Sequence, residues 1–225
     1  MPWGDRDRCL SREATMTAVL LAWVVLSGCA GIAPGSTSWS DAPDPLPMAA
    51  ARAAGPGPAS YDEALRVWKT PEDIAAWSAA RFVYDTDRAL QLSETERQKG
   101  ADPTIPAPAD LFERPTGTCL DLARFGLETL QRIDPQSRPR YLMVEFEPLQ
   151  LKGRTLRRHW LVSFRRGDGV YVFADSKRPW LVAGPYESVD AFIREYERFR
   201  GRNIVRFYET DSYRRQLRRT RTSAP

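Results

Sequence analysis

Cys119, His159 and Asp175 have the side-chain types and the chain order needed for nucleophilic catalysis. A thiolate attacks a carbonyl carbon, an imidazole takes the thiol proton, and a carboxylate holds that imidazole in one tautomer. His159 is the sole histidine of the sequence, and no cysteine follows Cys29 except Cys119. The residues therefore indicate cysteine-nucleophile chemistry, provided that the fold brings the three together.

The residues around Cys119 have the pattern of a helix N-terminus. Thr118 can cap the helix while Asp121 reaches back to its amide, which makes Cys119 the first helical residue. The unpaired N–H groups of that turn favour a thiolate and can donate to an oxyanion. The alternative is a small buried core cysteine, which is the commoner fate of a lone cysteine. Helical spacing of apolar residues continues to Ile133 and predicts a buried amphipathic helix.

His159 opens a strand, HWLVSFRR, which turns through Gly167-Asp168-Gly169 into VYVFAD. Folding this hairpin about its turn brings His159 nearly opposite residues 175 to 178, so that Asp175 is within side-chain reach. A carboxylate there would orient the imidazole and stabilise imidazolium. Taken separately, His159 could be a hydrogen-bonded surface histidine and Asp175 a turn residue at the end of a strand.

The elements that must position these residues follow from capping and periodicity. Ser60 and Thr70 each precede an acid by three residues and predict helix starts, and the second helix would bury Ile74 and Trp77. Residues 100 to 115 are proline-rich and predict a loop. Period-two patterns predict strands at 141–146, 159–164, 170–174 and 203–208, and Ser188 and Gly201 bound a predicted helix at 189–200. The predicted elements follow an order along the chain, with helices first and a mostly antiparallel sheet afterwards, and this order predicts an α+β domain.

The segment Gly117–Ala123, GTCLDLA, resembles the G-x-C-x-D-x-A signature of the transglutaminase-like superfamily. The order Cys, His, Asp and the spacing of the three are most similar to the bacterial transglutaminase-like cysteine peptidases. The similarity covers about residues 70 to 210, and its lead-in helix carries Trp77, with Tyr84 after it. The resemblance implies a papain-like fold, with the cysteine helix packed on the sheet that supplies His and Asp.

The expected activity is that of a thiol hydrolase that cleaves a peptide or amide bond through a Cys119 thioester. The alternatives are a transamidase that uses the same triad for cross-linking, and a non-catalytic envelope scaffold. Calcium-dependent members of the peptidase group carry acids on both sides of the cysteine, whereas Thr118 precedes it here. Asp121 alone is a poor calcium site, so we expect no metal and no cofactor. Trp77 and Tyr84 are the candidates for the second oxyanion donor.

The first thirty residues indicate export. An apolar run, TAVLLAWVVL, is too short to span a bilayer and is followed by Leu-Ser-Gly-Cys29, which resembles the lipobox of bacterial lipoproteins. Lipid on Cys29 would anchor the protein in the cell envelope, and Ala30 after it implies the outer membrane, facing the periplasm. The alternative is a plain secretory signal with a coincidental cysteine.

Length and composition predict one folded domain in a chain of 225 residues. We expect a signal peptide at 1–28, a lipidated cysteine and flexible Pro/Gly/Ala/Ser-rich tether at 29–59, the hydrolase domain at 60–213 and a basic disordered tail at 214–225. The net charge of +4 owes much to arginines in that tail. They lack interleaved aromatic residues, so we expect no nucleic-acid partner, only a protein or peptide substrate and the membrane.

Overall fold

Five antiparallel strands form the sheet that carries His159, in the order β6-β5-β4-β3-β7. The computed structural model describes residues 40–48, 57–102 and 104–214, all within one compact unit, 36–225. The sheet strands are β3 (Arg140–Leu151), β4 (Arg154–Arg166), β5 (Gly169–Phe173), β6 (Ala183–Tyr186) and β7 (Ile204–Thr210). A separate parallel pair consists of β1 (Val83–Tyr84) and β2 (Thr116–Gly117).

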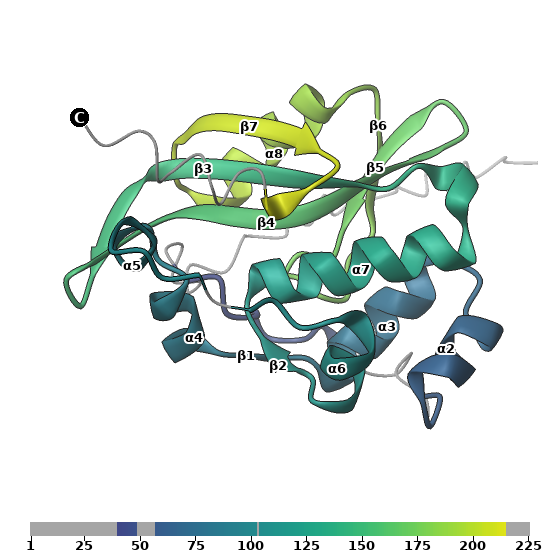
Figure 1. Cartoon of the computed structure of the whole chain (residues 1–225). Helices are drawn as coiled ribbons and strands as arrows, with labels where there is room; N and C mark the ends of the chain where they lie inside the picture. Colours follow the sequence, from purple (N-terminus) through teal and green to yellow (C-terminus); the bar gives the residue numbers. More distant parts are fainter. Residues whose placement is uncertain (1–39, 49–56, 103, 215–225) are drawn as a thin grey trace, which may run out of the picture. The chain divides into compact units, whose positions relative to one another are not determined.

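Helices cover both faces of the sheet, and α7 and α8 lie on opposite sides of it (Figure 1). The helices are α2 (Tyr61–Val67), α3 (Pro71–Arg81), α4 (Thr86–Gln91), α5 (Glu94–Gln98), α6 (Pro108–Glu113), α7 (Cys119–Ile133) and α8 (Val189–Arg200), with a 3-10 turn at Pro135–Ser137. None of the helices in the described residues is long and apolar enough to cross a membrane.

Alternate residues of the strands contribute side chains to two separate apolar cores. On β3, Tyr141 and Met143 face the larger core with α7, whereas Leu142 and Val144 face the smaller core with α8. This alternation follows from the two-residue period of a strand, whose side chains point to opposite faces in turn. The prediction of an α+β fold with a mostly antiparallel sheet is thereby confirmed.

Helix α7 lies very close to the sheet beyond the end of β5. A Cβ atom on Gly126 would come within 2.7 Å of the Cβ of Ala174, so glycine is needed for this approach. Ala174 itself has a φ of 56°, in the left-handed region that disfavours side chains other than glycine. The close contact fixes the helix that carries Cys119 relative to the residue that precedes Asp175.

Several predicted elements are confirmed with their boundaries. Ser60, Thr70 and Ser188 are N-caps whose side chains accept from a backbone N–H, and α8 spans 189–200 and ends at Gly201. Cys119 is the first residue of α7, as the pattern predicted.

The prediction of a loop at residues 100–115 is wrong for part of its length. Helix α6 lies within it, with Pro108 in its first turn and Leu111 and Phe112 buried in the larger core. Proline is favoured at the start of a helix because the missing N–H has no partner there, so the prolines mark a helix start as well as loop residues. Helices α4 and α5 and strand β6 were not predicted.

Candidate active site

Cys119 lies at the N-terminus of α7, in the turn whose N–H groups have no partner within the helix. Its side chain is mostly buried, and it is a free thiol. The carboxylate of Asp121 reaches back and accepts from the Thr118 N–H at 2.8 Å and from the Thr118 hydroxyl at 3.0 Å. The sulfur therefore lies at the positive end of a long, buried helix, where a developing negative charge is favoured.

Arg88 fixes this helix start from a distant segment. Its Nε and Nη2 atoms donate to the two carboxylate oxygens of Asp121 at 2.7 and 2.8 Å. Asp121 is 1% exposed, so the arginine supplies the counter-charge that a buried carboxylate needs. Gly117 allows the approach, because a Cβ there would lie 2.8 Å from the Cβ of Asp121. The segment around the cysteine is thus held by an arginine ion pair.

His159 lies in the part of β4 that pairs with β3 on one side but does not pair with β5 on the other. The register of β5 with β4 ends at the pair Val162–Phe173, before it reaches His159, and the chain then turns back at Ala174. This turn places Asp175 Oδ1 at 2.9 Å from His159 Nε2. The Lys177 N–H donates to the same carboxylate oxygen at 2.9 Å. Both side chains are buried, so the hairpin brings the predicted imidazole and carboxylate together.

Helix α8 supplies a second layer behind the imidazole. The ring of Tyr196 stacks on His159 with centroids 6.1 Å apart and 21° between the planes. The Tyr196 hydroxyl accepts from Nη1 of Arg200 at 3.1 Å. Tyr196 and Arg200 are both completely or almost completely buried. An aromatic face and a buried cation therefore confine the imidazole from the side opposite the large core.

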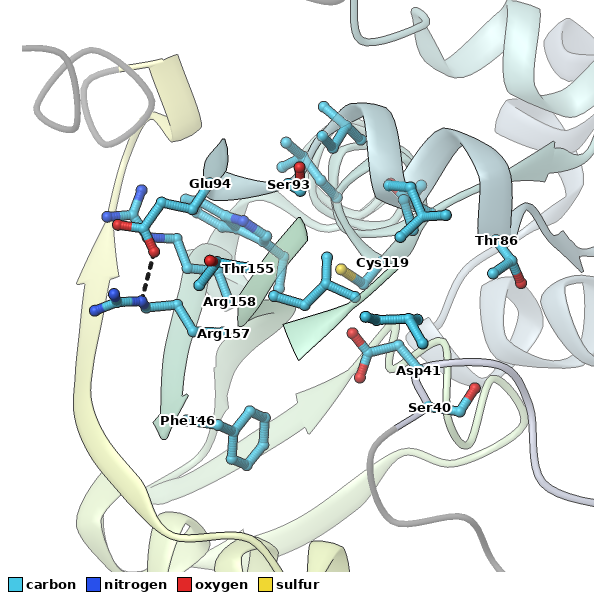
Figure 2. Close-up of a pocket in the computed structure, with 18 of the residues that line it drawn as sticks. Ser40, Asp41, Thr86, Ser93, Glu94, Cys119, Phe146, Thr155, Arg157 and Arg158 are labelled. Atoms are coloured by element: carbon cyan, nitrogen blue, oxygen red, sulfur yellow. Dashed lines mark ion pairs between the residues drawn. The ribbon is translucent and has the colours of Figure 1, made fainter. Parts of the chain in front are cut away.

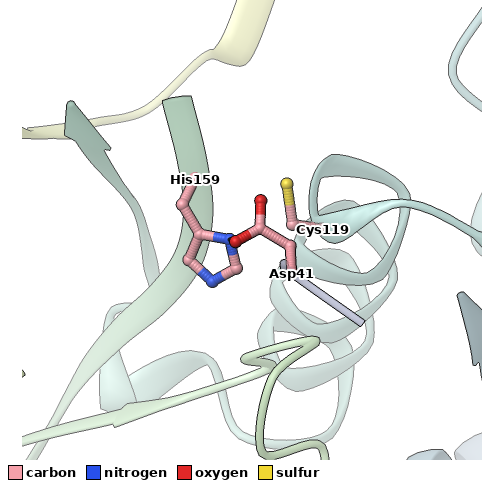
Figure 3. Close-up of side chains that lie close together, drawn as sticks. All are labelled: Asp41, Cys119 and His159. Carbon is pink, nitrogen blue, oxygen red and sulfur yellow. The ribbon is translucent and has the colours of Figure 1, made fainter. Parts of the chain in front are cut away.

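The other imidazole nitrogen faces an acid from upstream of the predicted domain. Asp41 Oδ1 lies 3.2 Å from His159 Nδ1 and 2.7 Å from Nη2 of Arg200. Ligand-type atoms of Asp41, Cys119 and His159 all lie within 4.8 Å of one another. Figure 3 shows the Asp41 carboxylate between the imidazole and the Cys119 side chain in that view. The site thus contains four chemically competent groups where the sequence indicated three.

The position of Asp41 in the site differs from the expectation of a flexible tether at 29–59. Asp41 and Asp44 contact the domain, and the backbone carbonyl of Asp41 accepts from the Ser176 hydroxyl at 2.8 Å. Ion pairs explain the difference. A composition rich in proline and small residues predicts little apolar burial, but it does not show whether the acids of the segment form ion pairs with the domain. Cys29 and the predicted signal lie outside the described residues, as does the tail from 215 onward.

The charges of the site shift the pKa values of its members in opposite directions. Burial alone would lower the pKa of His159, but the Asp41, Tyr196 and Asp175 side chains outweigh it and raise that pKa well above 6.5. Burial alone would raise the pKa of Asp175, yet His159 and nearby arginines lower it to about 2. The pKa of Asp41 is lowered against the same effect of burial by His159 and Arg200. The imidazole is therefore held as a cation between two carboxylates.

A metal ion is the other possible occupant of this cluster, since Asp, Cys and His are all ligands of zinc. Among the described residues, Asp41, Cys119 and His159 form the group of three whose ligand atoms approach closely enough. A cation placed there would lie beside the Arg200 guanidinium, which already contacts the Asp41 oxygen at 2.7 Å. Electrostatics therefore favour the ion pair with Arg200 over a metal.

A pocket opens beside the sulfur of Cys119 (Figure 2). Asp41 and Cys119 lie on its wall, and much of its remaining surface is made by aliphatic and aromatic residues and by arginines. The apolar part consists of Leu90, Leu92, Leu120, Phe146, Leu151, Leu156 and Trp160. The basic part consists of Arg97, Arg157, Arg158 and Arg202. The pocket therefore has an apolar part and a basic part beside the thiol.

The two aromatic candidates for the second oxyanion donor are placed differently. Trp77 lies in the core, stacked on Phe112 at 5.1 Å and packed on Phe125 at 4.6 Å. Tyr84 lines the pocket together with Cys119. Burial, and then the negative charges of Asp41 and Cys119, raise the pKa of Tyr84, so its hydroxyl stays protonated. Of the two, Tyr84 is the residue positioned to donate a hydrogen bond near the thiol.

Sequence reasoning missed Asp41, Arg88, Tyr196 and Arg200. A signal existed for the last two, because Tyr196 and Arg200 continue the buried stripe of α8 at helical spacing, and an arginine on an apolar stripe requires a counter-charge. Asp41 and Arg88 gave no such signal, since each meets its partner through contacts between segments distant in the sequence.

The fold and the site together define an α+β protein with a cysteine at a helix N-terminus beside an imidazole–carboxylate pair. No protein-family model matches the chain, and no curated protein matches it. Among solved structures, Legionella pneumophila LapG (EGTA-treated) is similar over 70% of this chain and 94% of its own, with 11% identity and a TM-score of 0.28. A likeness this weak carries no argument about the activity of the chain.

Proposed function

We propose that this protein is a thiol hydrolase with a papain-like, transglutaminase-like fold, in which Cys119 is the nucleophile, His159 the base and Asp175 the orienting carboxylate. The observation that carries the proposal is the 2.9 Å contact between His159 Nε2 and Asp175 Oδ1, together with a ring nitrogen of His159 that lies within 4.8 Å of the Cys119 sulfur. This is the arrangement that a nucleophile, a base and an orienting acid require.

The proposed reaction proceeds through an acyl-enzyme. In the reactive form the proton of the Cys119 thiol is on His159 Nδ1, as a thiolate–imidazolium pair, and the sulfur bonds to the carbonyl carbon of a peptide or amide. The tetrahedral oxyanion accepts hydrogen bonds from N–H groups at the start of α7 and from the Tyr84 hydroxyl. Nδ1 then protonates the leaving amine as the C–N bond breaks, which leaves a thioester. Water, deprotonated by His159, attacks the thioester, releases a carboxylic acid and restores the thiol.

Asp175 acts through His159 in this scheme. Its carboxylate binds the Nε2 hydrogen, so that Nδ1 is the nitrogen free to exchange a proton with the thiol. The Lys177 N–H holds the carboxylate in place at 2.9 Å. Asp175 is therefore a positioning residue, whereas Cys119 and His159 contact the reacting atoms.

Identification of cleavage products tests the proposal. Envelope proteins of the source cell are incubated with the wild-type protein and with Cys119→Ser, and peptides that end at a new carboxyl terminus are identified by mass spectrometry. The proposal expects such termini with the wild type and their absence with Cys119→Ser. New isopeptide cross-links without new carboxyl termini would overturn hydrolysis in favour of transamidation. Cleavage that survives in Cys119→Ser would exclude Cys119 as the nucleophile.

We also propose that the protein is anchored in the cell envelope by lipid on Cys29, facing the periplasm from the outer membrane. The support is the apolar run that ends in Leu-Ser-Gly-Cys29, followed by Ala30. Wild-type protein from cells should then enter the detergent phase in a phase-partitioning assay, and Cys29→Ala should remain in the aqueous phase. Equal partitioning of the two into the aqueous phase would disprove the anchor.

A further inference from the structure

Residues 40–44 lie across the candidate active site and are held by contacts to both side chain and backbone. The Asp41 carboxylate pairs with Arg200 at 2.7 Å, and the Asp41 carbonyl accepts from the Ser176 hydroxyl at 2.8 Å. The Asp44 N–H donates to the Lys177 carbonyl at 2.9 Å, and the Asp44 carboxylate pairs with Lys177 Nζ at 2.6 Å. These contacts recognise two acids three residues apart together with the backbone that joins them.

The two cationic anchors are buried in the folded unit. The side chain of Arg200 is 0% exposed and that of Lys177 is 4% exposed. Charges removed from water to this extent require counter-charges, because a buried charge left without its partner costs several kcal/mol. Asp41 is a counter-charge of Arg200, and Asp44 is a counter-charge of Lys177. Arg200 and Lys177 are therefore placed to hold a chain that carries carboxylates at these two positions.

The sequence of the segment suits it to this extended binding. Residues 41–47 read Asp-Ala-Pro-Asp-Pro-Leu-Pro, with proline at every second position from 43. Each proline fixes its own φ and restricts the residue before it to extended conformations. Docking such a segment orders fewer torsions than docking a flexible one, which lowers the entropic cost of binding.

The docked position of Asp41 opposes the proposed chemistry. Its carboxylate lies 3.2 Å from the His159 nitrogen that must exchange a proton with the thiol, and close to the Cys119 sulfur. A carboxylate there competes for that proton and repels both a thiolate and an oxyanion. It also occupies space beside the sulfur that a substrate carbonyl would need.

We propose that residues 40–44 are an acidic peptide bound in cis across the catalytic groove, and that Arg200 and Lys177 form a subsite for acidic peptide segments. The segment blocks Cys119 while it is docked, and a substrate chain with acids at matching positions takes its place. The blocking role rests on the proposed function, since it assumes that Cys119 is the nucleophile.

Removal of the two carboxylates tests the blocking role. Rates of carbamidomethylation of Cys119 by iodoacetamide are measured for the wild type, Asp41→Ala with Asp44→Ala, and the isosteric pair Asp41→Asn with Asp44→Asn. If the segment is docked more than nine-tenths of the time, its release should accelerate labelling by at least about tenfold. Asp62→Ala, which removes an exposed acid from the first turn of α2, is the matched control and should not change the rate. Unchanged or slower labelling in both double variants would overturn the proposal and indicate a positioning role for Asp41.

A peptide added in trans tests the subsite. The nonapeptide of residues 40–48, SDAPDPLPM, should restore slow labelling to the Asp-to-Ala double variant, whereas the same peptide with asparagine at both acidic positions should not. Equal effects of the two peptides, or no effect of either, would rule out an acid-specific subsite. His159→Ala, placed in the double variant, reports separately on thiol activation. If labelling does not slow on its addition, the proposed triad fails while the result on the segment still stands.

Discussion

His159 Nε2 lies 2.9 Å from Oδ1 of Asp175, and this contact joins the portion of β4 that has no pairing with β5 to the residues that follow β5. The other ring nitrogen lies 3.2 Å from Asp41 Oδ1. One hairpin therefore fixes the orientation of the imidazole.

The two members of this pair should differ in their effect on thiol reactivity. His159→Ala removes the group that deprotonates the thiol, so iodoacetamide labelling of Cys119 at pH 6 should slow by about tenfold or more. Asp175→Asn disturbs orientation and basicity alone and should slow labelling less. Circular dichroism should show that both variants fold. Labelling unchanged by either substitution would identify Cys119 as a core residue with no activated thiol.

The raised pKa of His159 links stability to pH. Its charged form is favoured in the fold, so the stabilisation is fully present below the unfolded value of 6.5 and is lost as pH rises through the higher folded pKa. Urea unfolding at pH 6 and pH 9 should therefore show a larger fall in the free energy of unfolding for the wild type than for His159→Gln. Parallel falls in the two proteins would contradict the raised pKa.

The lowered pKa of Asp175 makes the stability of the fold depend on pH in acidic solution. The carboxylate stabilises the fold above its unfolded pKa of 3.8, and this contribution is lost as pH falls toward about 2. Wild-type protein should lose stability between these two pH values more steeply than Asp175→Asn does, as followed by the midpoint of thermal unfolding. Equal slopes for the two proteins would show that Asp175 has an ordinary pKa.

The Arg88–Asp121 pair should matter far more to stability than an exposed pair of the same geometry. Arg88→Ala leaves a buried carboxylate without its counter-charge and should cost about 3 kcal/mol in the free energy of unfolding. The control is Arg166→Ala, which breaks a bidentate contact to Glu72 with both side chains near half exposure and should cost about 1 kcal/mol or less. Equal losses in urea titrations would argue against a role for Arg88 in fixing the helix start.

The contact between Gly126 and Ala174 should couple helix packing to the site. Gly126→Ala places a methyl group 2.7 Å from the Ala174 Cβ, and the overpacking should destabilise the fold by about 1–3 kcal/mol. It should also slow Cys119 labelling at pH 6, because Ala174 precedes Asp175. The second change Ala174→Gly removes the opposing methyl and suits the positive φ, so the double variant should recover both properties. Purely additive effects would show that the two positions do not interact.

The sequence by itself determined the local structures that carry the predicted triad. Thr118 and Asp121 specify a helix start, which makes Cys119 the first residue of α7 whatever surrounds it. The Gly-Asp-Gly turn sets the register of β4 and β5, and with it the separation of His159 and Asp175. These features depend on hydrogen bonds and torsions within a few residues or within one hairpin, so short patterns suffice to predict them.

Only the tertiary structure decided which other charges enter the site. Asp41 meets His159 and Arg200 from far upstream, and Arg88 meets Asp121 from helix α4. Each contact depends on the packing of several elements at once, and an acid or an arginine in a polar segment has the same local pattern whether it is solvated or buried in a pair. A charge that is removed from water requires a counter-charge, and which charges are removed from water is settled by which segments cover one another in the folded chain.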